Sequence, residues 1–271
     1  MQKYTFKNHQ LIEEKQAQVS ISERGLLFGD GIFETCKIFN GKIYDFSAHQ
    51  FRIKAGLKAL KFSADISDLE KKSLQLIKKN ALQNGILRIA ISRGIGSAGY
   101  LPTYETEALI LIQTFAEREF PKKITLGISS TKTPVSPLGK TMNALPYILT
   151  KIDAAEKNLF DGVMFSQKKF VAETSSSNIF WVKNGKVFTA SKACDILLGT
   201  VRKRLLKISP FKIHEVEATL ATLKKADEIF LTNSAFLALP VDEFLGKKLQ
   251  KNFGNKFLEL LQEDVRKMCK S

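Results

Sequence analysis

Four short segments of the chain combine residue types that commonly serve in catalysis or ligand binding. Gly199-Thr200-Val201-Arg202 opens a predicted helix, where main-chain N–H groups and a nearby guanidinium could bind a phosphate. Glu173 ends a predicted strand, from which its carboxylate could reach a buried cationic ring. Lys140 precedes another predicted helix, and Arg93 lies in a glycine-rich loop that lacks the spacing of a dinucleotide site. Each segment also has an ordinary explanation, as a capped helix, a polar turn, a solvated lysine or a flexible loop.

The histidines and cysteines form no catalytic or metal-binding constellation. The three histidines show neither a Ser/His/Asp arrangement nor metal-ligand spacing, so we expect no metal site. The three cysteines are odd in number, far apart and without a CxxC pair, which argues against a disulfide framework and favours a reducing compartment. These residues are His9, His49 and His214, and Cys36, Cys194 and Cys269.

The elements expected to position these residues begin with an α+β region. Two β-rich runs between Gly31 and Phe46 flank Asn40-Gly41, the dipeptide best suited to a type I′ turn, and they predict a hairpin. Apolar residues at helical spacing predict two helices after it, and β-branched residues predict two buried strands. The helices are expected over Ala48–Leu60, with Phe51 on the apolar side, and from Ser67 to Gly85, with Leu69, Leu74, Ile77 and Leu82 on one side; the strands are expected over Ile86–Ser92 and Ala108–Gln113.

A change of pattern divides the chain into two parts. Periodicity is lost over Phe115–Pro121, which ends at a proline and is the best candidate for an interdomain linker. We therefore expect an N-terminal α+β domain over residues 1–114, a linker over 115–121 and a C-terminal α/β domain over 122–271, which carries Lys140. The elements predicted in the C-terminal part are the strand Ile124–Ser129, the helix Asn143–Lys157, a strand run from Val163 to Thr189 with turns at Gln167-Lys168 and Asn184-Gly185, a helix starting at Gly199, the strand Glu228–Leu231 and the helix Lys256–Lys270.

The composition agrees with a folded protein of two modest domains. The 271 residues are 44% hydrophobic and 25% charged, which excludes a disordered or low-complexity chain. The N-terminus lacks the pattern of a secretion signal and no apolar run could span a bilayer, so we expect a cytoplasmic protein without membrane association. The formal net charge is +15. Because the basic residues are spread along the chain without interleaved aromatics, we expect no nucleic-acid binding, and the charge is compatible with an anionic small substrate.

Taken together and in order, these segments resemble the fold-type IV pyridoxal-phosphate enzymes, the class IV aminotransferase family. The resemblance runs from about Ser20 to Val241, nearly the whole chain. It implies a two-domain fold like that of the D-amino-acid aminotransferases, α+β in one domain and α/β in the other. It also implies a homodimer with active sites between the domains. The segments that carry the resemblance are residues 22–35, His49-Gln50-Phe51-Arg52, Lys140-Thr141-Met142-Asn143, Glu173 to Phe180, Leu198 to Arg202, and Ala226 to Ser234.

The resemblance implies pyridoxal 5′-phosphate as the cofactor and gives each site residue a role. Lys140 is the catalytic lysine that forms the Schiff base, Glu173 pairs with the pyridinium nitrogen, and Arg52 binds the phosphate. A protonated ring nitrogen lets the ring take up electrons when a bond at the amine-bearing carbon breaks, and the released lysine can then move the proton. The other cofactor-binding residues implied are Ser177, Asn178, Gly199, Thr200 and Val201.

Within the family, three features favour a 4-amino-4-deoxychorismate lyase, which breaks a C–O bond to release pyruvate and 4-aminobenzoate in folate biosynthesis. The loop Ile91–Tyr100 resembles the lyase loop in length and pattern, Thr232-Asn233-Ser234 resembles the lyase form of its segment, and the chain is short. The resemblance implies four substrate-side residues, Thr35, Arg93, Asn233 and Ser234. The chain departs from the lyase pattern at Glu23, at Ala98, where an Arg could contact a substrate carboxylate, and at Ala144.

Two other functions are open on the sequence. A D-amino-acid or branched-chain transaminase of the same family would differ by its need for a 2-oxo acid to restore the cofactor in each cycle. A basic nucleic-acid-binding protein would show binding that weakens steeply with salt and would lack the absorbance of the cofactor.

Overall fold

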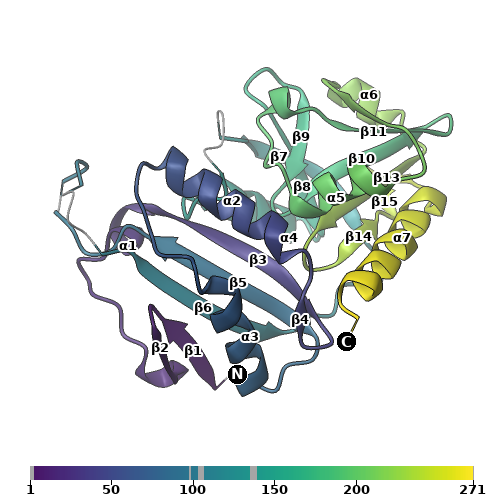
Figure 1. Ribbon diagram of the computed structural model, residues 1–271. Helices are drawn as coiled ribbons and strands as arrows, with labels where there is room; N and C mark the ends of the chain where they lie inside the picture. The colour runs from purple at the N-terminus through teal and green to yellow at the C-terminus, as the bar shows by residue number, and fades with distance from the viewer. Residues whose placement is uncertain (1–2, 98, 103–106, 135–138, 271) are drawn as a thin grey trace. The chain divides into compact units, whose positions relative to one another are not determined.

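The computed structural model describes residues 3–97, 99–102, 107–134 and 139–270. Strands and helices are mixed along the chain, so the predicted fold class of α and β elements is confirmed (Figure 1). Contacts divide the chain into two units, each described by itself. Unit 1 comprises Met1–Arg118, Leu138–Asn143 and Val265–Ser271, and unit 2 comprises Glu119–Pro137 and Ala144–Asp264.

Unit 1 is built on a six-stranded antiparallel sheet in the order β2-β1-β6-β5-β3-β4. The predicted hairpin is confirmed between β3 and β4, where Asn40 and Gly41 both have positive φ angles, 50° and 71°, as a type I′ turn requires. The strands of this sheet are β1 (Tyr4–Lys7), β2 (Gln10–Glu13), β3 (Gly31–Phe39), β4 (Lys42–Ile43), β5 (Gly85–Ser92) and β6 (Leu109–Ala116).

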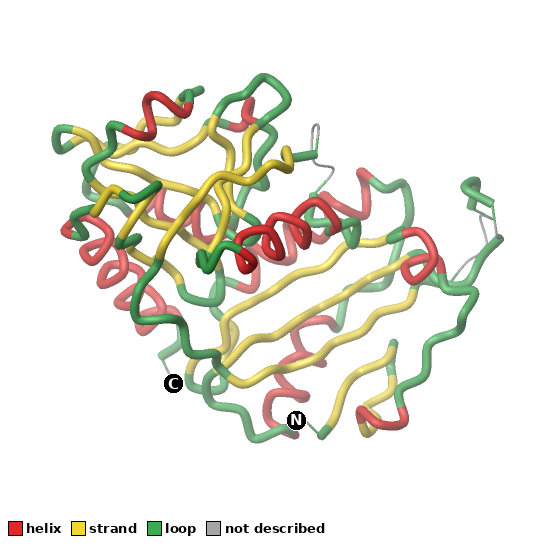
Figure 2. Tube along the Cα trace, turned by 180° about the vertical axis from the view of Figure 1, so that it is seen from behind, coloured by secondary structure: helices red, strands yellow, loops and turns green. Residues whose placement is uncertain are grey.

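Two helices, α2 (Phe46–Ala59) and α3 (Leu69–Lys79), cover one face of this sheet, as Figure 1 shows. Figure 2, seen from behind, shows the strands of unit 1 in front of them. Residues 32, 36 and 38 of β3 join the core beneath the helices. Because side chains alternate along a strand, Phe33 and Thr35 point to the opposite face. A single-turn helix, α1 (Arg24–Phe28), and the short 3-10 helix η1 (Glu14–Gln16) precede β3.

Helix α3 is shorter than predicted, and the side that it presents to the core differs from the predicted one. It ends at Lys79, and Ala81 turns the chain with a φ angle of 50°. Leu82 packs against the core from beyond the helix, whereas Leu74 is exposed. On α2, Phe51 is also exposed, at 65% of its surface, so the predictions that Leu74 and Phe51 face the core are wrong. Apolar spacing alone did not distinguish the buried side of either helix.

Unit 2 is built on a larger sheet in the order β12-β11-β10-β9-β8-β7-β15-β16, with β13 paired to β10 and β14 paired to β13. Three pairs, β7 with β8, β7 with β15 and β11 with β12, are parallel, and the other pairs of this sheet are antiparallel. The predicted run from Val163 to Thr189 therefore contains four strands. The strands are β7 (Thr125–Lys132), β8 (Asp161–Phe165), β9 (Val171–Thr174), β10 (Asn178–Lys183), β11 (Lys186–Ala190), β12 (Ile213–Val216), β13 (Glu228–Asn233), β14 (Leu237–Pro240), β15 (Glu243–Phe244) and β16 (Lys247–Lys248).

Aromatic packing and one long-range cap hold the last helix in place. The rings of Phe180 and Phe230 stack at 5.0 Å, and the Phe230 ring lies 5.0 Å from that of Phe257. The Glu228 carboxylate accepts hydrogen bonds from the N–H groups of residues 253 and 254 at the start of the last helix, at 2.8 and 3.3 Å, so this helix begins before the predicted Lys256. The helices of unit 2 are α4 (Leu145–Glu156), η2 (Lys192–Cys194), α5 (Thr200–Ile208), α6 (Leu220–Lys224) and α7 (Asn252–Met268), whose last turn the contacts assign to unit 1.

The contacts assign the Lys140 segment to unit 1, whereas the sequence placed it in the C-terminal domain. The N–H of Phe33 donates to the carbonyl of Lys140 at 2.8 Å, and the N–H of Met142 donates to the carbonyl of Gly31 at 2.9 Å. The lysine segment is thus bonded to β3 by an isolated antiparallel bridge between Ile32 and Thr141. The predicted linker also differs, because its first two residues are the end of β6.

Candidate active site

Lys140 lies in unit 1 with its ammonium group over an aromatic ring. Its Nζ is 4.4 Å from the centroid of the Phe33 ring, and the side chain is partly buried. Its backbone stays in place because Gly31 lets the segments approach closely: a Cβ on Gly31 would lie 2.9 Å from the Met142 sulfur and 2.6 Å from the carbonyl of Ile91. A partly desolvated amine on a fixed backbone suits covalent attachment and proton transfer.

Arg52, the predicted phosphate ligand, belongs to a buried ion cluster in unit 1. Its Nε and Nη2 donate to the two carboxylate oxygens of Glu34, each at 2.6 Å, and His49 Nδ1 lies 2.7 Å from the same carboxylate. Burial alone would raise the pKa of Glu34, but the hydrogen bonds from Arg52 and His49 outweigh it and lower the pKa to about 2. The cluster therefore holds the guanidinium of Arg52 in one orientation.

Glu173 is a buried carboxylate at the end of β9 in unit 2, 3% exposed. It accepts hydrogen bonds from the Tyr147 hydroxyl at 3.1 Å, from Asn178 Nδ2 at 3.2 Å and from the N–H of Leu197 at 3.1 Å. Burial and the charge of Glu173 raise the pKa of Tyr147, so the phenol keeps its proton and donates. A carboxylate fixed by such donors suits the ionised partner of a cationic ring nitrogen.

The start of α5, beside this carboxylate, can bind an anion. Gly199 caps the helix, and a Cβ there would lie 2.2 Å from Asn178 Oδ1, so only glycine fits against the asparagine. The Thr200 and Ser234 hydroxyls lie 3.3 Å apart near the helix start, and Val201 supplies a further first-turn N–H. Among the described residues, the buried hydroxyl of Thr232, which pairs with Asn178 across β10 and β13, has no hydrogen-bond partner. These groups fit a phosphate.

Asn233 and Ser177 are joined by a hydrogen bond that ties two turns together. Asn233 Nδ2 donates to the Ser177 hydroxyl and to the Ser176 carbonyl, both at 3.2 Å, while its Oδ1 accepts from the N–H groups of Ala235 and Phe236. The predicted polar turn between Glu173 and Asn178 is therefore tied to the next strand pair, and this tie fixes the position of Asn178.

The substrate-side predictions in unit 1 have different surroundings. Thr35 is partly buried on the face of β3 that carries Phe33, opposite Arg88 of β5. Arg93 donates to both oxygens of Asp30, at 2.8 and 3.2 Å, and also to main-chain carbonyls, so its guanidinium is engaged within the fold. Its role toward substrate stays a prediction. Ala98 lies outside the described residues.

Two residues near the predicted ones were not found from the sequence. The exposed guanidinium of Arg88 lies 4.9 Å from the centroid of the same Phe33 ring that Lys140 contacts. The sequence signal for Arg88 was a charged residue in the middle of an otherwise apolar strand. The second residue is Tyr147, on the first turn of α4. Nothing near Tyr147 in the sequence indicated that it contacts Glu173.

The predicted residues thus fall into one group in each unit. Unit 1 contains an amine and a fixed guanidinium. Unit 2 contains a buried carboxylate and an anion-binding helix start, which Asn178 links to each other. The groups of unit 2 suit a ligand that carries a protonated ring nitrogen, which would pair with the carboxylate, and a phosphate, which would bind at the helix start. The members are Thr35, Arg52, Arg93 and Lys140 in unit 1, and Glu173, Ser177, Asn178, Gly199, Thr200, Val201, Asn233 and Ser234 in unit 2.

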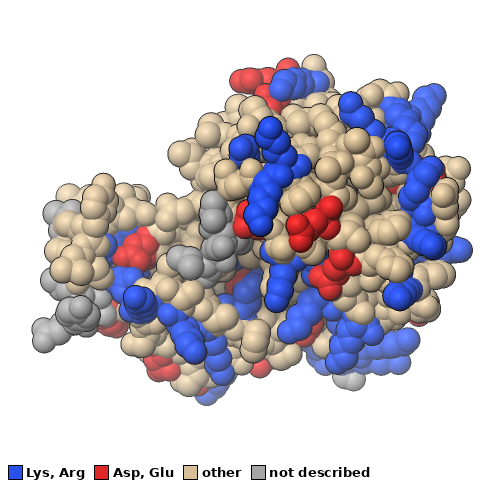
Figure 3. Space-filling model, turned by 90° about the horizontal axis from the view of Figure 1, so that it is seen from above, with Lys and Arg blue, Asp and Glu red and all other residues tan. Residues whose placement is uncertain are grey.

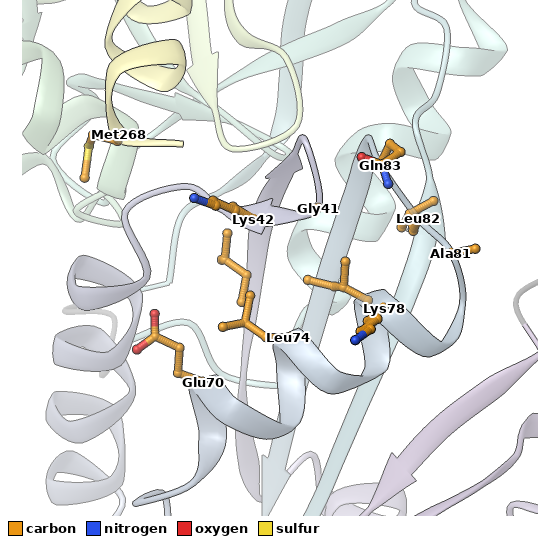
Figure 4. A pocket seen from close by; sticks show the side chains of 11 residues that line it. Gly41, Lys42, Glu70, Leu74, Lys78, Ala81, Leu82, Gln83 and Met268 are labelled. Carbon is orange, nitrogen blue, oxygen red and sulfur yellow. The ribbon is translucent and has the colours of Figure 1, made fainter. Parts of the chain in front are cut away.

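A separate pocket of about 720 Å³ in unit 1 contains none of these residues (Figure 4). It is lined by Lys42, Glu70, Leu74, Lys78 and Met268, among others. These residues come from β4 and the turn before it, from α3 and the segment after it, and from the end of α7. Basic side chains on the face shown in Figure 3 are spread among acidic and uncharged ones. Within the part of the chain that the structure describes, no helix has the length and apolarity needed to cross a membrane.

Comparisons with known proteins give one consistent result. A model of the family described as amino-transferase class IV matches residues 31–244. An aminodeoxychorismate lyase from Vibrio harveyi is 28% identical over 241 residues, covering 83% of this chain and 87% of that protein. A D-alanine aminotransferase from Listeria monocytogenes is 27% identical over 251 residues, covering 88% and 86%.

Among solved structures, a branched-chain amino acid aminotransferase from Escherichia coli superposes with a TM-score of 0.92 at 19% identity, covering 98% of this chain and 95% of that one. Other solved structures of this fold hold pyridoxal or pyridoxamine 5′-phosphate. At such identities the likeness shows the fold, and the predicted fold type is confirmed.

Proposed function

Because this chain belongs to the class IV amino-transferase family, whose enzymes depend on pyridoxal 5′-phosphate, we propose that it is a 4-amino-4-deoxychorismate lyase that releases pyruvate and 4-aminobenzoate. The observation that supports this choice is the loop after β5. Its residues carry the resemblance to the lyase, and the Arg24 guanidinium donates to three of its carbonyls, at residues 97, 99 and 100. These hydrogen bonds fix the backbone of the loop at those three residues within unit 1.

In this proposal each of the residues described above has a role toward the cofactor. Arg52 and the N–H groups of Thr200 and Val201 bind the phosphate by charge and helix dipole. Glu173 keeps a proton on the ring nitrogen, and Asn178 orients the Glu173 carboxylate. When bound, pyridoxal 5′-phosphate takes up the electron pair released at the amine-bearing carbon.

Lys140 supplies the proton transfers. Its amine removes the proton from the ring carbon that bears the substrate amino group, while the enolpyruvyl oxygen leaves the neighbouring carbon and the substrate ring becomes aromatic. Lys140 then returns a proton to the leaving side, so that pyruvate forms. Atoms and electrons balance without a second substrate. Thr35, Arg93, Asn233 and Ser234 are the proposed substrate-side residues.

The alternative is a D-amino-acid or branched-chain transaminase. It is favoured by Arg88, whose guanidinium shares the Phe33 ring with Lys140 and could bind an amino-acid carboxylate.

Steady-state kinetics separate the two proposals. We expect kcat/KM for aminodeoxychorismate, assayed without a 2-oxo acid, to exceed kcat/KM for D-alanine or for a branched-chain amino acid. The two amino acids are assayed with 2-oxoglutarate as the amino-group acceptor. The reverse order would contradict the lyase proposal and leave the cofactor assignment standing. Arg88→Gln serves as the diagnostic variant, because it should weaken amino-acid turnover if the alternative holds.

A further inference from the structure

Arg24 lies at the first position of α1, is 3% exposed, and directs its guanidinium at one loop. Its Nη1 donates to the carbonyls of Ser97 and Gly99, at 3.0 and 2.7 Å, and its Nη2 donates to the carbonyl of Tyr100 at 3.0 Å. Its Nε donates to Asp30 at 2.9 Å. A planar guanidinium can reach this set of acceptors at once, and a lysine ammonium cannot.

A second arginine fastens the beginning of the same loop to the same carboxylate. Arg93 donates to both oxygens of Asp30 and, from Nη2, to the carbonyl of Leu60 at 2.7 Å. Main-chain bonds run alongside: the N–H of Arg93 donates to the carbonyl of Asp30 at 3.0 Å, and the N–H of Arg24 donates to the carbonyl of Gly94 at 2.9 Å. Both ends of the loop are therefore tied to residues 24–30.

The segment that ties the loop also holds the lysine. Gly31, next to Asp30, accepts a hydrogen bond from the N–H of Met142 at 2.9 Å, and Ile32 forms a bridge with Thr141. A displacement of Asp30 would therefore move both the loop and the strand edge to which Lys140 is bonded. The loop and the lysine share one support within unit 1.

We propose that Arg24 is a positioning residue for the reaction at Lys140, which acts by fixing residues 93–97 and 99–101 of the loop after β5 and does not touch the substrate. The proposal rests on the proposed function in one respect: this loop contacts the amine substrate. Three apolar side chains on it, Ile95, Tyr100 and Leu101, are 59%, 90% and 77% exposed and project from a backbone that Arg24 holds. Loss of Arg24 should then weaken substrate binding more than it slows the chemical step.

The test compares the holoenzymes of the natural protein, Arg24→Gln, Arg24→Lys and Arg204→Lys. Arg204 is the matched control, because it forms a comparable two-point pair with Asp264 in unit 2. Amide hydrogen exchange is followed in the peptide covering residues 93–101, and kcat and KM are measured with whichever amine substrate the enzyme turns over. Borohydride attachment of the cofactor to Lys140 checks that each variant is loaded.

We expect exchange in residues 93–101 to rise and KM to rise about tenfold in Arg24→Gln, with kcat changed less and the cofactor still attached. Arg24→Lys should fall between, and Arg204→Lys should match the natural protein in both measurements. Exchange in Arg24→Gln no faster than in Arg204→Lys would overturn the proposal, as would faster exchange without a rise in KM. Should Arg24→Gln not fold, Arg24→Lys decides by the same two criteria. A preference of the enzyme for an amino acid over aminodeoxychorismate would contradict the lyase proposal and leave the Arg24 proposal standing. The exchange rate and the change in KM can be measured with either amine.

Discussion

At the scale of single residues, Lys140 has the largest part in the proposed reaction. Borohydride reduction of the holoenzyme should attach the pyridoxyl group to this lysine, because its amine is the proposed covalent partner of the cofactor. Lys140→Ala should lower turnover by orders of magnitude, since it removes both the covalent link and the proton carrier. Lys58→Ala, an exposed position on α2, is the control and should react normally. Peptide mapping that finds the label on a different lysine would refute the assignment.

The second residue-scale prediction concerns Glu173. Glu173→Gln keeps the shape of the side chain. Its amide oxygen can accept from the N–H of Leu197 and from Asn178 Nδ2, and its amide nitrogen can donate to the Tyr147 hydroxyl, so the fold should persist and the cofactor should bind. A neutral amide holds the proton of the ring nitrogen poorly, so proton removal from the substrate should slow far more than substrate binding. Rapid-mixing absorbance traces follow both steps. Equal slowing of the two would count against this role.

At the scale of elements, the ion cluster between β3 and α2 makes stability depend on pH. The folded pKa of Glu34 is about 2, below its ordinary 4.5, so the cluster stabilises the fold above pH 4.5 and loses this contribution as the pH falls toward 2. Glu34→Gln should therefore destabilise the protein at pH 7 by on the order of 3 kcal/mol, and by less than half of that at pH 3. Urea unfolding at the two pH values measures the difference.

The control for this prediction is Glu243→Gln, which removes the charge of a partly exposed carboxylate that pairs with the exposed Lys123. Such surface pairs contribute about 0–1 kcal/mol, so this variant should change stability little at either pH. A loss in Glu34→Gln that did not shrink with falling pH would mean that packing, and not charge, explains the effect.

The elements also show what sequence patterns could and could not predict. The Asn40-Gly41 hairpin and the polar turn after Glu173 follow from residue types next to one another in the chain, and both are confirmed. The neighbours of Glu173 do not follow in that way. Tyr147 and Leu197 reach its carboxylate from 26 and 24 positions away, and Glu228 caps a helix 25 positions later. Contacts at such separations depend on the folded sheet and leave no local pattern.

At the scale of the whole molecule, we propose a homodimer that uses the outer side of α4. Leu145, Ile148, Leu149 and Ile152 are 62%, 51%, 47% and 49% exposed and lie at helical spacing along one stripe. The neighbouring Lys151 is turned back onto Phe160 and Asp161 of its own unit, which leaves the stripe uncharged. In a chain with a net charge of +15, an uncharged apolar stripe is where two copies can meet without repulsion.

Ile148→Glu should convert the dimer to a monomer of 30.4 kDa in sedimentation equilibrium, because it places a charge in the proposed contact. Leu74→Glu is the control, since Leu74 is an exposed leucine on α3 of unit 1 and should leave the dimer intact. A dimer that persists in Ile148→Glu, or a natural protein that sediments as a monomer, would exclude this surface.

In the proposed reaction, Lys140 carries out an elimination that regenerates the starting enzyme in every cycle. The most direct measurement is the amount of pyruvate and 4-aminobenzoate formed per active site from aminodeoxychorismate, followed over time without any 2-oxo acid. We predict equal amounts of the two products, increasing steadily to many equivalents per site. Consumption of aminodeoxychorismate that stops at one equivalent per site without releasing 4-aminobenzoate, and that resumes only when a 2-oxo acid is added, would contradict the lyase proposal and identify a transaminase.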